Sequence, residues 1–555
     1  MGRALVLQRF KKHHPTIEGA HTASAIHTQY YFTPTKQACR VETTPAMMGT
    51  VPKRDSRGGA HQQGGIFMAQ ISRRSFVASG VAGIAACTMG VAATSSAKAA
   101  EGDAYDVIVL GGGGAGLSAA VEAADAGASV LVLDKNTVTG GTTATSQGLI
   151  GGFGTQIQKA QGVELTYEEM YDNLNFNASY RLDPELMAIT VDKSGESIDW
   201  LADRCAVPFQ PEAKVGYGPL TMMHVVDGAG MALTDALAAT AEAAGVAILV
   251  NTQATEILVD GGAACGVKAV DTATGEETTY PCKALVVATG GYSCNPELAA
   301  RFTPEVAGTM GIGHPMATGD GIIMASNVGA CTSHTDSMMC VLKDYEIMTE
   351  HTPTSAAASV RGFTTLPNTI MVGTEGKRFC NEAADGYMSQ DLNRPVFDQM
   401  HKDEKGYVWM LSDQATVDAT EGKTVRGEEL EYVSGDTPEA IAELMGVDPA
   451  GLAATIEAYN AAVDAGFDPD FGRQPTVKLE PPFVAMPVTP CSIITYGGIA
   501  RNADGEVVRA DGTSIPGLFC AGETSCNSAF MGFTISNAIT WGRIAGAGAA
   551  QFATA

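Results

Sequence analysis

A glycine-rich turn between a strand and a helix constrains the fold of this chain more than any other feature. The apolar run Tyr105–Leu110 predicts a strand, and Gly111–Gly116 then opens an alanine-rich stretch with helical character. Ser129–Leu133 predicts a second strand that ends at Asp134, 18 residues after Gly116. The order strand, Gly-x-Gly-x-x-Gly, helix, strand, acid is typical of a dinucleotide-binding βαβ unit.

Each residue of this motif has a separate physical task. Gly111 permits the tight turn, Gly113 lets the backbone approach a pyrophosphate, and Gly116 lets the helix and the strand pack closely. The free N–H groups at the helix N-terminus favour phosphate binding. Asp134 is expected to accept a hydrogen bond from a ribose hydroxyl.

Further blocks, in a fixed order along the chain, carry a family resemblance. They are Thr139–Gly148, Ala284–Gly291, Ala317–Gly321, Ile515–Glu523 and Asn537–Arg543. Together with the glycine motif they resemble the FAD-binding flavoprotein of the fumarate reductase and succinate dehydrogenase superfamily. The resemblance covers about Tyr105 to Ala550 and is to the soluble flavocytochrome c-like and ketosteroid reductase-like branch, without a haem domain.

The resemblance implies FAD as the cofactor, held by residues from all of these blocks. The implied contacts come from Gly111, Gly113, Gly114, Ala115, Gly116, Asp134, Lys135, Gly141, Thr142, Thr143, Ser146, Gly148, Ala254, Thr289, Gly290, Asp320, Glu523, Ser536, Asn537, Ala538 and Ile539. Membrane-bound relatives attach FAD to a histidine just after the acidic strand end. Lys135–Ser146 contains no histidine, so we expect noncovalent FAD.

The position of these blocks predicts an α/β fold: a Rossmann-type FAD-binding domain in two chain segments, with an inserted α+β capping domain. The first segment is expected at 100–335 and the second at 491–555. The capping domain, at 336–490, shows helical patterns at Pro438–Met445 and Leu452–Ala465. In the family such a domain closes over the substrate, which excludes water and completes the site.

The expected substrate pocket departs from that of the soluble fumarate reductases. Those enzymes hold a dicarboxylate with two histidines and an arginine, and protonate it through a second arginine. The matching positions here hold Ile494, Phe533 and Gly386, with Cys340 and Val341 near the other histidine position, and the relay glutamate is absent near Val360–Gly362. An apolar pocket leaves the desolvation of two carboxylates uncompensated, so we expect a different substrate.

Three residues are candidates for catalysis in this altered pocket: Tyr387, Tyr496 and Arg361. Either phenol could donate a proton or polarise a carbonyl, as tyrosines do in ketosteroid-converting relatives. The alternative for each is a core tyrosine with a satisfied hydroxyl. Arg361 could anchor a single carboxylate or form a surface ion pair. His314 is expected to support its loop.

The N-terminal hundred residues predict export. Residues 1–67 lack sustained periodicity and are interpreted as disordered or as a mis-assigned extension before Met68. Residues 68–99 resemble a twin-arginine signal peptide, with Ser72–Val77 as the export motif and Ala97–Ala99 as the exit. We therefore expect a periplasmic or cell-envelope protein that meets the twin-arginine translocation machinery. Cys87 is the alternative, as a lipid anchor.

Composition excludes other function classes. The net charge of −26 argues against nucleic-acid binding, and the 12 cysteines form no Cys-x-x-Cys pair that would indicate zinc, so we expect no metal. Because no haem, iron–sulfur or second nucleotide motif is present, electrons are expected from an external membrane or periplasmic carrier.

The function expected from these features is reduction of a carbon–carbon double bond in an α,β-unsaturated carbonyl compound, in anaerobic respiration or detoxification. The alternatives are desaturation of a ketone or ketosteroid, a fumarate reductase-like respiratory activity, and a non-enzymatic electron-transfer flavoprotein.

Overall fold

The computed structural model describes residues 104–178, 180–215, 220–306, 309–336, 338–344, 368–382, 390–419, 432–475, 477–526 and 532–555. Contacts divide the chain into residues 1–91 and 92–555, and every described residue belongs to the second unit. The predicted extension 1–67 and signal peptide 68–99 lie outside the described residues.

The larger sheet carries the dinucleotide motif. Among the described residues it has eight strands, and β19, β9, β1, β2 and β6 lie side by side and parallel. Strand β18 pairs antiparallel with β19, while β7 and β8 extend the sheet from β9. The strands are β1 (Tyr105–Leu110), β2 (Val130–Leu133), β6 (Ala247–Leu249), β7 (Thr252–Asp260), β8 (Ala263–Asp271), β9 (Glu277–Val287), β18 (Glu506–Val508) and β19 (Ser514–Cys520).

Strands from both ends of the described chain therefore meet in one sheet. Strand β19 pairs with β9, which pairs with β1, although more than 200 residues separate β9 from β19. The predicted strand Tyr105–Leu110 is confirmed, with the same first and last residues. Its side chains from Val107 to Leu110 are 0% exposed. A run buried on both faces is typical of a central parallel strand.

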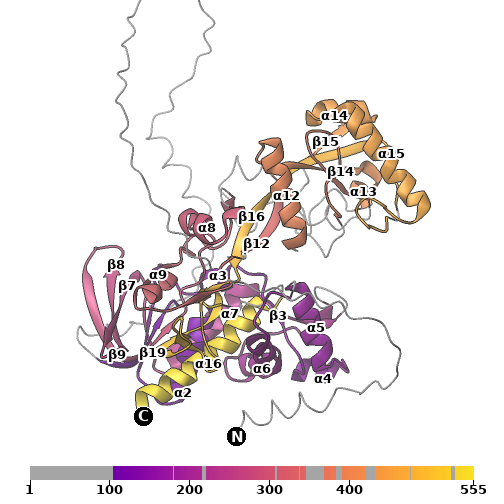
Figure 1. Ribbon diagram of the computed structural model, residues 1–555. Helices are drawn as coiled ribbons and strands as arrows, with labels where there is room; N and C mark the ends of the chain where they lie inside the picture. Colours follow the sequence, from indigo (N-terminus) through magenta and orange to yellow (C-terminus); the bar gives the residue numbers. More distant parts are fainter. Residues whose placement is uncertain are drawn as a thin grey trace, which may run out of the picture. The chain divides into compact units, whose positions relative to one another are not determined.

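Two helices pack closely on this sheet because both present small residues. Helix α2 (Gly114–Asp125) lies along α16 (Thr534–Thr554), as Figure 1 shows. A Cβ atom on Gly542 would lie 2.4 Å from the Ala115 carbonyl oxygen, and one on Gly546 would lie 2.2 Å from that of Ala119. These glycines let the C-terminal helix approach the backbone of the glycine-motif helix.

A second sheet contains the strands expected in the capping region. Strand β16 (Phe483–Thr495) pairs with β10, β12, β14 and β15, and β13 pairs with β14. The predicted boundary at 490 falls inside β16, because this strand continues to Thr495. The other strands are β10 (Met310–Gly311), β12 (Met338–Asp344), β13 (Ile370–Val372), β14 (Val408–Asp413) and β15 (Val433–Gly435).

Helices α14 (Pro438–Met445) and α15 (Pro449–Ala465) share a core with this sheet. The predicted helix Pro438–Met445 is confirmed, and the predicted helix Leu452–Ala465 begins three residues earlier, at Pro449, where Asp448 caps it. Remaining elements are α3 (Gly141–Ala144), β3 (Leu149–Gly151), α4 (Gln156–Gln161), α5 (Tyr167–Asn177), α6 (Pro184–Asp203), β4 (Lys214–Val215), β5 (Thr221–Val225), α7 (Ala229–Ala243), α8 (Pro296–Phe302), η1 (Pro304–Val306), α9 (Asp320–Asn327), β11 (Thr332–Ser333), α12 (Gln390–Asp403), α13 (Gln414–Ala419), β17 (Gly498–Ile499) and η2 (Gly522–Thr524).

A network of buried ion pairs joins the chain segments around the second sheet. Arg378 binds Glu382 through Nε and Nη2, at 2.9 and 2.7 Å, and Asp468 through Nη1 at 2.8 Å. Arg473 Nη1 donates to Glu382 at 3.1 Å and to the Thr369 carbonyl at 2.7 Å. The four charged side chains are 2–7% exposed, and two positive charges balance two negative ones.

Removal of one charge from this network is expected to destabilise the protein. Arg473→Met leaves Glu382 with a buried charge that is only partly compensated, which costs about 3–5 kcal/mol of unfolding free energy. Urea denaturation measures the loss. Lys193→Met is the matched control, because the exposed Lys193–Glu196 pair contributes at most about 1 kcal/mol. Equal effects of the two substitutions would contradict this account of the network.

Candidate active site

The glycine turn has the geometry that its motif predicts. Gly111 has φ +99°, and a Cβ there would lie 2.4 Å from the Ala288 carbonyl oxygen. A Cβ on Gly116 would lie 1.8 Å from the Gly111 carbonyl oxygen, so only glycine permits this close packing. A Cβ on Gly113, by contrast, would meet nothing closer than the Gly140 carbonyl oxygen at 3.7 Å. The backbone at Gly113 therefore borders open space.

That open space is a cavity lined by the predicted flavin-binding blocks. Its wall includes Gly113 and Gly114 at the N-terminus of α2, Thr142 and Thr143 of α3, and Gly290 after β9. The Thr143 hydroxyl accepts a hydrogen bond from the Gly114 amide at 3.2 Å, which ties α3 to the glycine turn. The loop expected at 139–148 thus contains one helical turn.

Asp134 anchors the glycine turn from the end of β2. Its Oδ2 accepts from the Gly112 amide at 2.7 Å and its Oδ1 from the Asn136 amide at 2.8 Å. The side chain is 5% exposed and still lines the cavity. Each carboxylate oxygen keeps a second lone pair, so the predicted ribose contact stays a prediction.

A charged pair lies beside Asp134. Lys135 Nζ donates to Asp320 Oδ2 at 2.9 Å and to the Thr318 hydroxyl at 2.6 Å, and Gln253 donates to the same Asp320 oxygen at 3.0 Å. Burial alone would raise the pKa of Asp320, but the hydrogen bonds from Thr318 and Lys135 outweigh it and lower that pKa. The charge of Lys135 is therefore neutralised within the protein.

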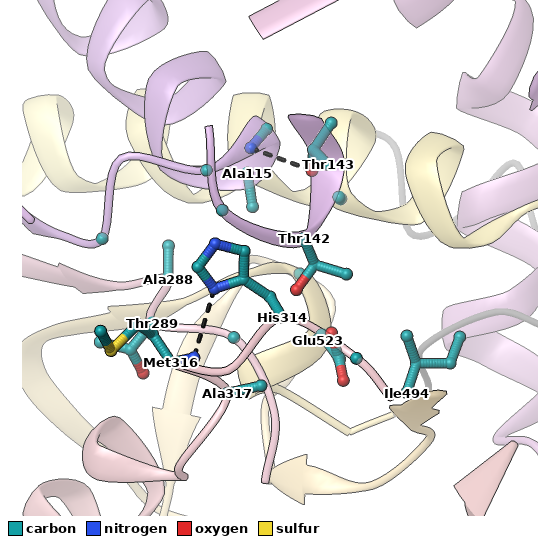
Figure 2. Close-up of a pocket in the computed structure, with 18 of the residues that line it drawn as sticks. Ala115, Thr142, Thr143, Ala288, Thr289, His314, Met316, Ala317, Ile494 and Glu523 are labelled. Atoms are coloured by element: carbon teal, nitrogen blue, oxygen red, sulfur yellow. Dashed lines mark hydrogen bonds between the residues drawn. The ribbon is translucent and has the colours of Figure 1, made fainter. Parts of the chain in front are cut away.

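Glu523 is the buried acid of the cavity. Its Oε1 accepts from the Thr495 amide at 2.9 Å, and this bond joins the end of β16 to the turn η2. Burial raises the pKa of Glu523 to about 7, against a smaller lowering by the hydrogen bonds from Thr495. Figure 2 shows Glu523 and Ile494 on the same side of the cavity, with the His314 ring between Thr142 and Ala288.

An apolar wall adjoins Glu523. Met339 and Val341 of β12 and Ile493 and Ile494 of β16 line the cavity there. These strands pair antiparallel, with Met339 opposite Ile494. By the family resemblance, Ile494 stands at one of the two expected histidine positions and Val341 lies near the other. Both side chains are at most 5% exposed.

Two basic residues line the cavity among the described residues, Lys135 and His314. Lys135 is paired with Asp320, and His314 Nδ1 accepts from the Met316 amide at 3.3 Å, in agreement with the expected loop-supporting role. Burial lowers the pKa of His314, which favours the neutral imidazole. The described part of the cavity thus offers no unpaired cation for a carboxylate.

Five of the predicted cofactor contacts lie behind the cavity wall and not on it. Gly116 faces the Gly111 carbonyl, Gly148 packs on the Ala229 backbone, and Ser536 donates a hydrogen bond to the Gly151 carbonyl. Ile539 belongs to an apolar core cluster, and Asn537 is fully buried. The packing of Gly116, Gly148, Ser536 and Ile539 shapes the wall from behind, and the predicted FAD contacts of all five residues stay predictions.

Tyr496 also differs from its expected position. Its side chain is 4% exposed, does not line the cavity, and packs in the same apolar cluster as Phe533 and Ile494. Burial raises the pKa of its phenol well above the ordinary value. Tyr496 therefore does not line this cavity in the structure, and its predicted contact with the substrate stays a prediction. Tyr387 and Arg361 lie outside the described residues.

The residues present fit FAD. Cβ atoms on Gly113, Gly141 and Gly290 would project into space free of protein atoms within 3.6 Å, and the starts of α2 and α3 line the cavity, where a helix N-terminus favours a pyrophosphate. In the described part of the chain, neither polar atom of the buried Asn537 amide has a hydrogen-bond partner, next to Ala538 in the wall. A buried orphan amide beside a cavity is consistent with a polar ligand.

The sequence profile of the FAD binding domain family matches residues 106–534. The chain belongs to this family. It is an FAD-binding oxidoreductase of the fumarate reductase type. A urocanate reductase of Eggerthella lenta is 30% identical over 474 residues, covering 81% of this chain and 75% of that protein.

Other relatives support the same family. An NADH:fumarate oxidoreductase of Klebsiella pneumoniae is 29% identical, covering 83% of this chain; the chain spans about half (49%) of that relative's length. The open form of a flavocytochrome c3 fumarate reductase superposes with TM-score 0.67 at 27% identity, covering 82% of this chain and 80% of the other. A 3-ketosteroid-Δ4-(5α)-dehydrogenase from Rhodococcus jostii shares the fold, with TM-score 0.66 at 24% identity over 82% of this chain and 99% of the other.

Some cavity residues were not foreseen from the sequence. Gln253, Asn136 and Met316 line the cavity, and Gln253 contributes a hydrogen bond to Asp320. Successive residues of strand β7 point to opposite faces, so the sequence pattern alone does not show that Gln253 lies at the cavity. In the described part of the chain, no helix is long and apolar enough to cross a membrane, and no cluster of side chains is suited to hold a metal ion.

Substitution at the glycine turn separates cofactor binding from folding. Gly113 has φ −82°, so Gly113→Ala is expected to fold normally while its methyl group occupies the open space at the start of α2. We expect the Kd for FAD to rise about tenfold or more, which is about 1.4 kcal/mol. Flavin titration of the apoprotein measures this change.

The control variant for this prediction is Gly116→Ala. It places a methyl group against the Gly111 carbonyl and is expected to cost about 1–3 kcal/mol of unfolding free energy. Unchanged FAD affinity in Gly113→Ala would show that the pyrophosphate does not approach this turn.

The raised pKa of Glu523 predicts a pH-dependent stability of the flavin-free protein. The folded state keeps this proton up to about pH 7, whereas an unfolded glutamate loses it near 4.5. The contribution of Glu523 to the unfolding free energy therefore falls as pH rises through this window, by about 3 kcal/mol. Glu523→Gln removes the dependence, so its stability relative to wild type increases with pH. Parallel curves for both proteins between pH 4.5 and 7.5 would refute the burial argument.

Proposed function

We propose that this protein is an FAD-dependent reductase of the carbon–carbon double bond in an α,β-unsaturated carbonyl compound that is not a dicarboxylate. The observation that carries this proposal is the apolar wall of Met339, Val341 and Ile494 beside Glu523. Relatives named for urocanate and fumarate support the reaction class.

The wall argues for the substrate class through desolvation. A dicarboxylate that enters this cavity would lose hydration at two charges, and the described wall returns no unpaired cation to either. An enone with a carbocyclic or aromatic body loses little hydration and buries apolar area against β12 and β16. The same wall that disfavours fumarate therefore favours a largely apolar substrate.

The chain's own groups would orient the substrate and deliver a proton. Bound FAD would supply hydride to the β-carbon of the substrate. Tyr387, which the sequence places in the proton-donor region, is proposed to protonate the α-carbon or polarise the carbonyl. Arg361 is proposed to anchor a single carboxylate where the substrate has one.

The finer architecture and the cellular context are part of this proposal. We infer a two-segment Rossmann-type domain with the inserted region as its cap, because β19 joins the sheet of β1 and β9 while β12 to β15 form another sheet. FAD is proposed to be noncovalent. The twin-arginine signature supports export to the periplasm or cell envelope, with electrons from a membrane or periplasmic carrier.

A reduced-dye assay tests the proposed reaction. The purified holoenzyme is given reduced viologen under anaerobic conditions with fumarate, urocanate, a cinnamate or a steroidal enone, and dye oxidation is followed. We expect turnover with at least one apolar enone and little with fumarate. Rapid fumarate turnover contradicts the proposal, and bleaching of the oxidised flavin by a saturated ketone would reverse the assigned direction.

Two tyrosine variants form a matched test of the proton donor. Tyr387→Phe is expected to lower kcat by about 10²–10⁴-fold, the range of a lost general acid. Tyr496→Phe is expected to leave kcat near that of wild type, because this phenol lies in the apolar core and not in the cavity wall. The opposite ranking of the two variants would assign the acid to Tyr496.

A further inference from the structure

A pair of cysteines faces each other across the adjacent strands β8 and β9. None of the described cysteines forms a disulfide bond. Strands β8 and β9 pair antiparallel, with Val267 opposite Tyr280 and Gly266 opposite Pro281. One residue further along each strand, the same register places Cys265 opposite Cys282.

The separation implied by this register suits a disulfide. Directly opposite residues of an antiparallel pair have Cα atoms about 4.5 or 5.5 Å apart, depending on the hydrogen-bonding class, and their side chains share one face. Disulfides form at Cα separations of about 4.4–6.8 Å. Both classes of pair fall within that range, so the strands can be bridged without a large backbone movement.

The two thiols differ in access. Cys265 is half-buried, whereas Cys282 is 9% exposed. The pairing of β8 with β7 skips Cys265, because Leu258 lies opposite Gly266 and Val259 opposite Ala264. Burial, followed by the neighbouring Cys265, raises the pKa of Cys282 to about 12. Cys265 is therefore the thiol that an oxidant reaches first.

Another neighbouring cysteine pair lacks this arrangement. Cys340 of β12 lies opposite Ser492, and Cys491 of β16 lies opposite Val341. The offset of one residue separates their register positions, and both side chains are at most 1% exposed. Opposed register combined with solvent access distinguishes the β8–β9 pair from this one.

We propose that Cys265 and Cys282 form a redox-active thiol pair, which a small-molecule disulfide such as oxidised glutathione converts to an intramolecular disulfide. The Cys265 thiolate attacks one glutathione sulfur, the S–S bond of the oxidant breaks, and one glutathione thiolate leaves. Cys282 then loses its proton to solvent and attacks the Cys265 sulfur of the mixed disulfide, which releases the second glutathione. Two electrons pass to glutathione, and its two thiolates take up the two protons.

This bond would close the hairpin between β8 and β9. Strand β9 ends at Val287, directly before Ala288, Thr289 and Gly290 of the cavity wall. The bridge would restrict the unfolded chain and raise the melting temperature of the oxidised protein. It is independent of the substrate, so its test is separate from that of the proposed function.

Thiol counting and peptide mapping of the holoenzyme test the proposal. After incubation with oxidised glutathione and removal of the reagent, the denatured wild-type protein is expected to show two fewer free thiols. Mass spectrometry of a non-reduced digest is expected to show one peptide pair joining Cys265 and Cys282. The melting temperature is expected to rise on oxidation and to return to its original value after dithiothreitol reduces the bridge.

Single variants identify the partners. Cys265→Ser and Cys282→Ser are expected to abolish the joined peptide and the shift in melting temperature. Cys331→Ser, which alters another half-buried thiol, is expected to retain both. An unchanged thiol count, a glutathione adduct on Cys265 that never resolves, or a bridge to any other cysteine or to a second chain would each overturn the proposal. The mapping of the wild-type protein decides the matter even where a variant fails to fold.

Discussion

The site depends on the path of strand β16. This strand pairs with four others of the second sheet, yet its last residues reach the cavity, where the Thr495 amide donates to Glu523. Ile493 and Ile494, just before that bond, form part of the cavity wall. One continuous strand therefore sets both the apolar surface and the position of the buried acid. Displacement of β16 would move the two together.

The buried charges in and near the site are also paired within the protein. Arg378 and Arg473 neutralise Glu382 and Asp468 away from the cavity lining, and Lys135 neutralises Asp320 in the cavity wall. Elsewhere the cavity wall presents the Glu523 carboxyl group, with a pKa of about 7, and several aliphatic and thioether side chains. Such a surface accommodates a flat apolar molecule at low desolvation cost, whereas charged ends would stay unpaired.

The part of the site built from local sequence could be predicted. Gly116 packs against Gly111 within the motif, so the motif alone predicts that close approach, whereas the turn at Gly111 also packs on Ala288 after β9. Strand β1 and helix α14 were also predictable, because a buried apolar run and a Pro-initiated amphipathic turn depend on few long-range contacts. The family blocks then placed Glu523 and Thr142 at one cavity from positions far apart in the chain.

The remainder depends on contacts that local patterns do not encode. Tyr496 follows directly after β16, and the direction of its side chain is decided by packing with Phe533, whose position depends on α16. Gln253 joins the cavity only because β7 lies beside Asp320. The capping boundary was placed at 490 by motif position, but hydrogen bonding to β12 carries β16 on to Thr495.

A spectral titration tests the central claim most directly, namely that an apolar wall adjoins the flavin. Holoenzyme with oxidised FAD is titrated with a steroidal enone or with succinate, and the visible absorbance of the flavin is recorded. The account predicts a saturable perturbation by the enone and none by succinate at the same concentration. Saturable perturbation by succinate, without one by any apolar enone, would contradict it.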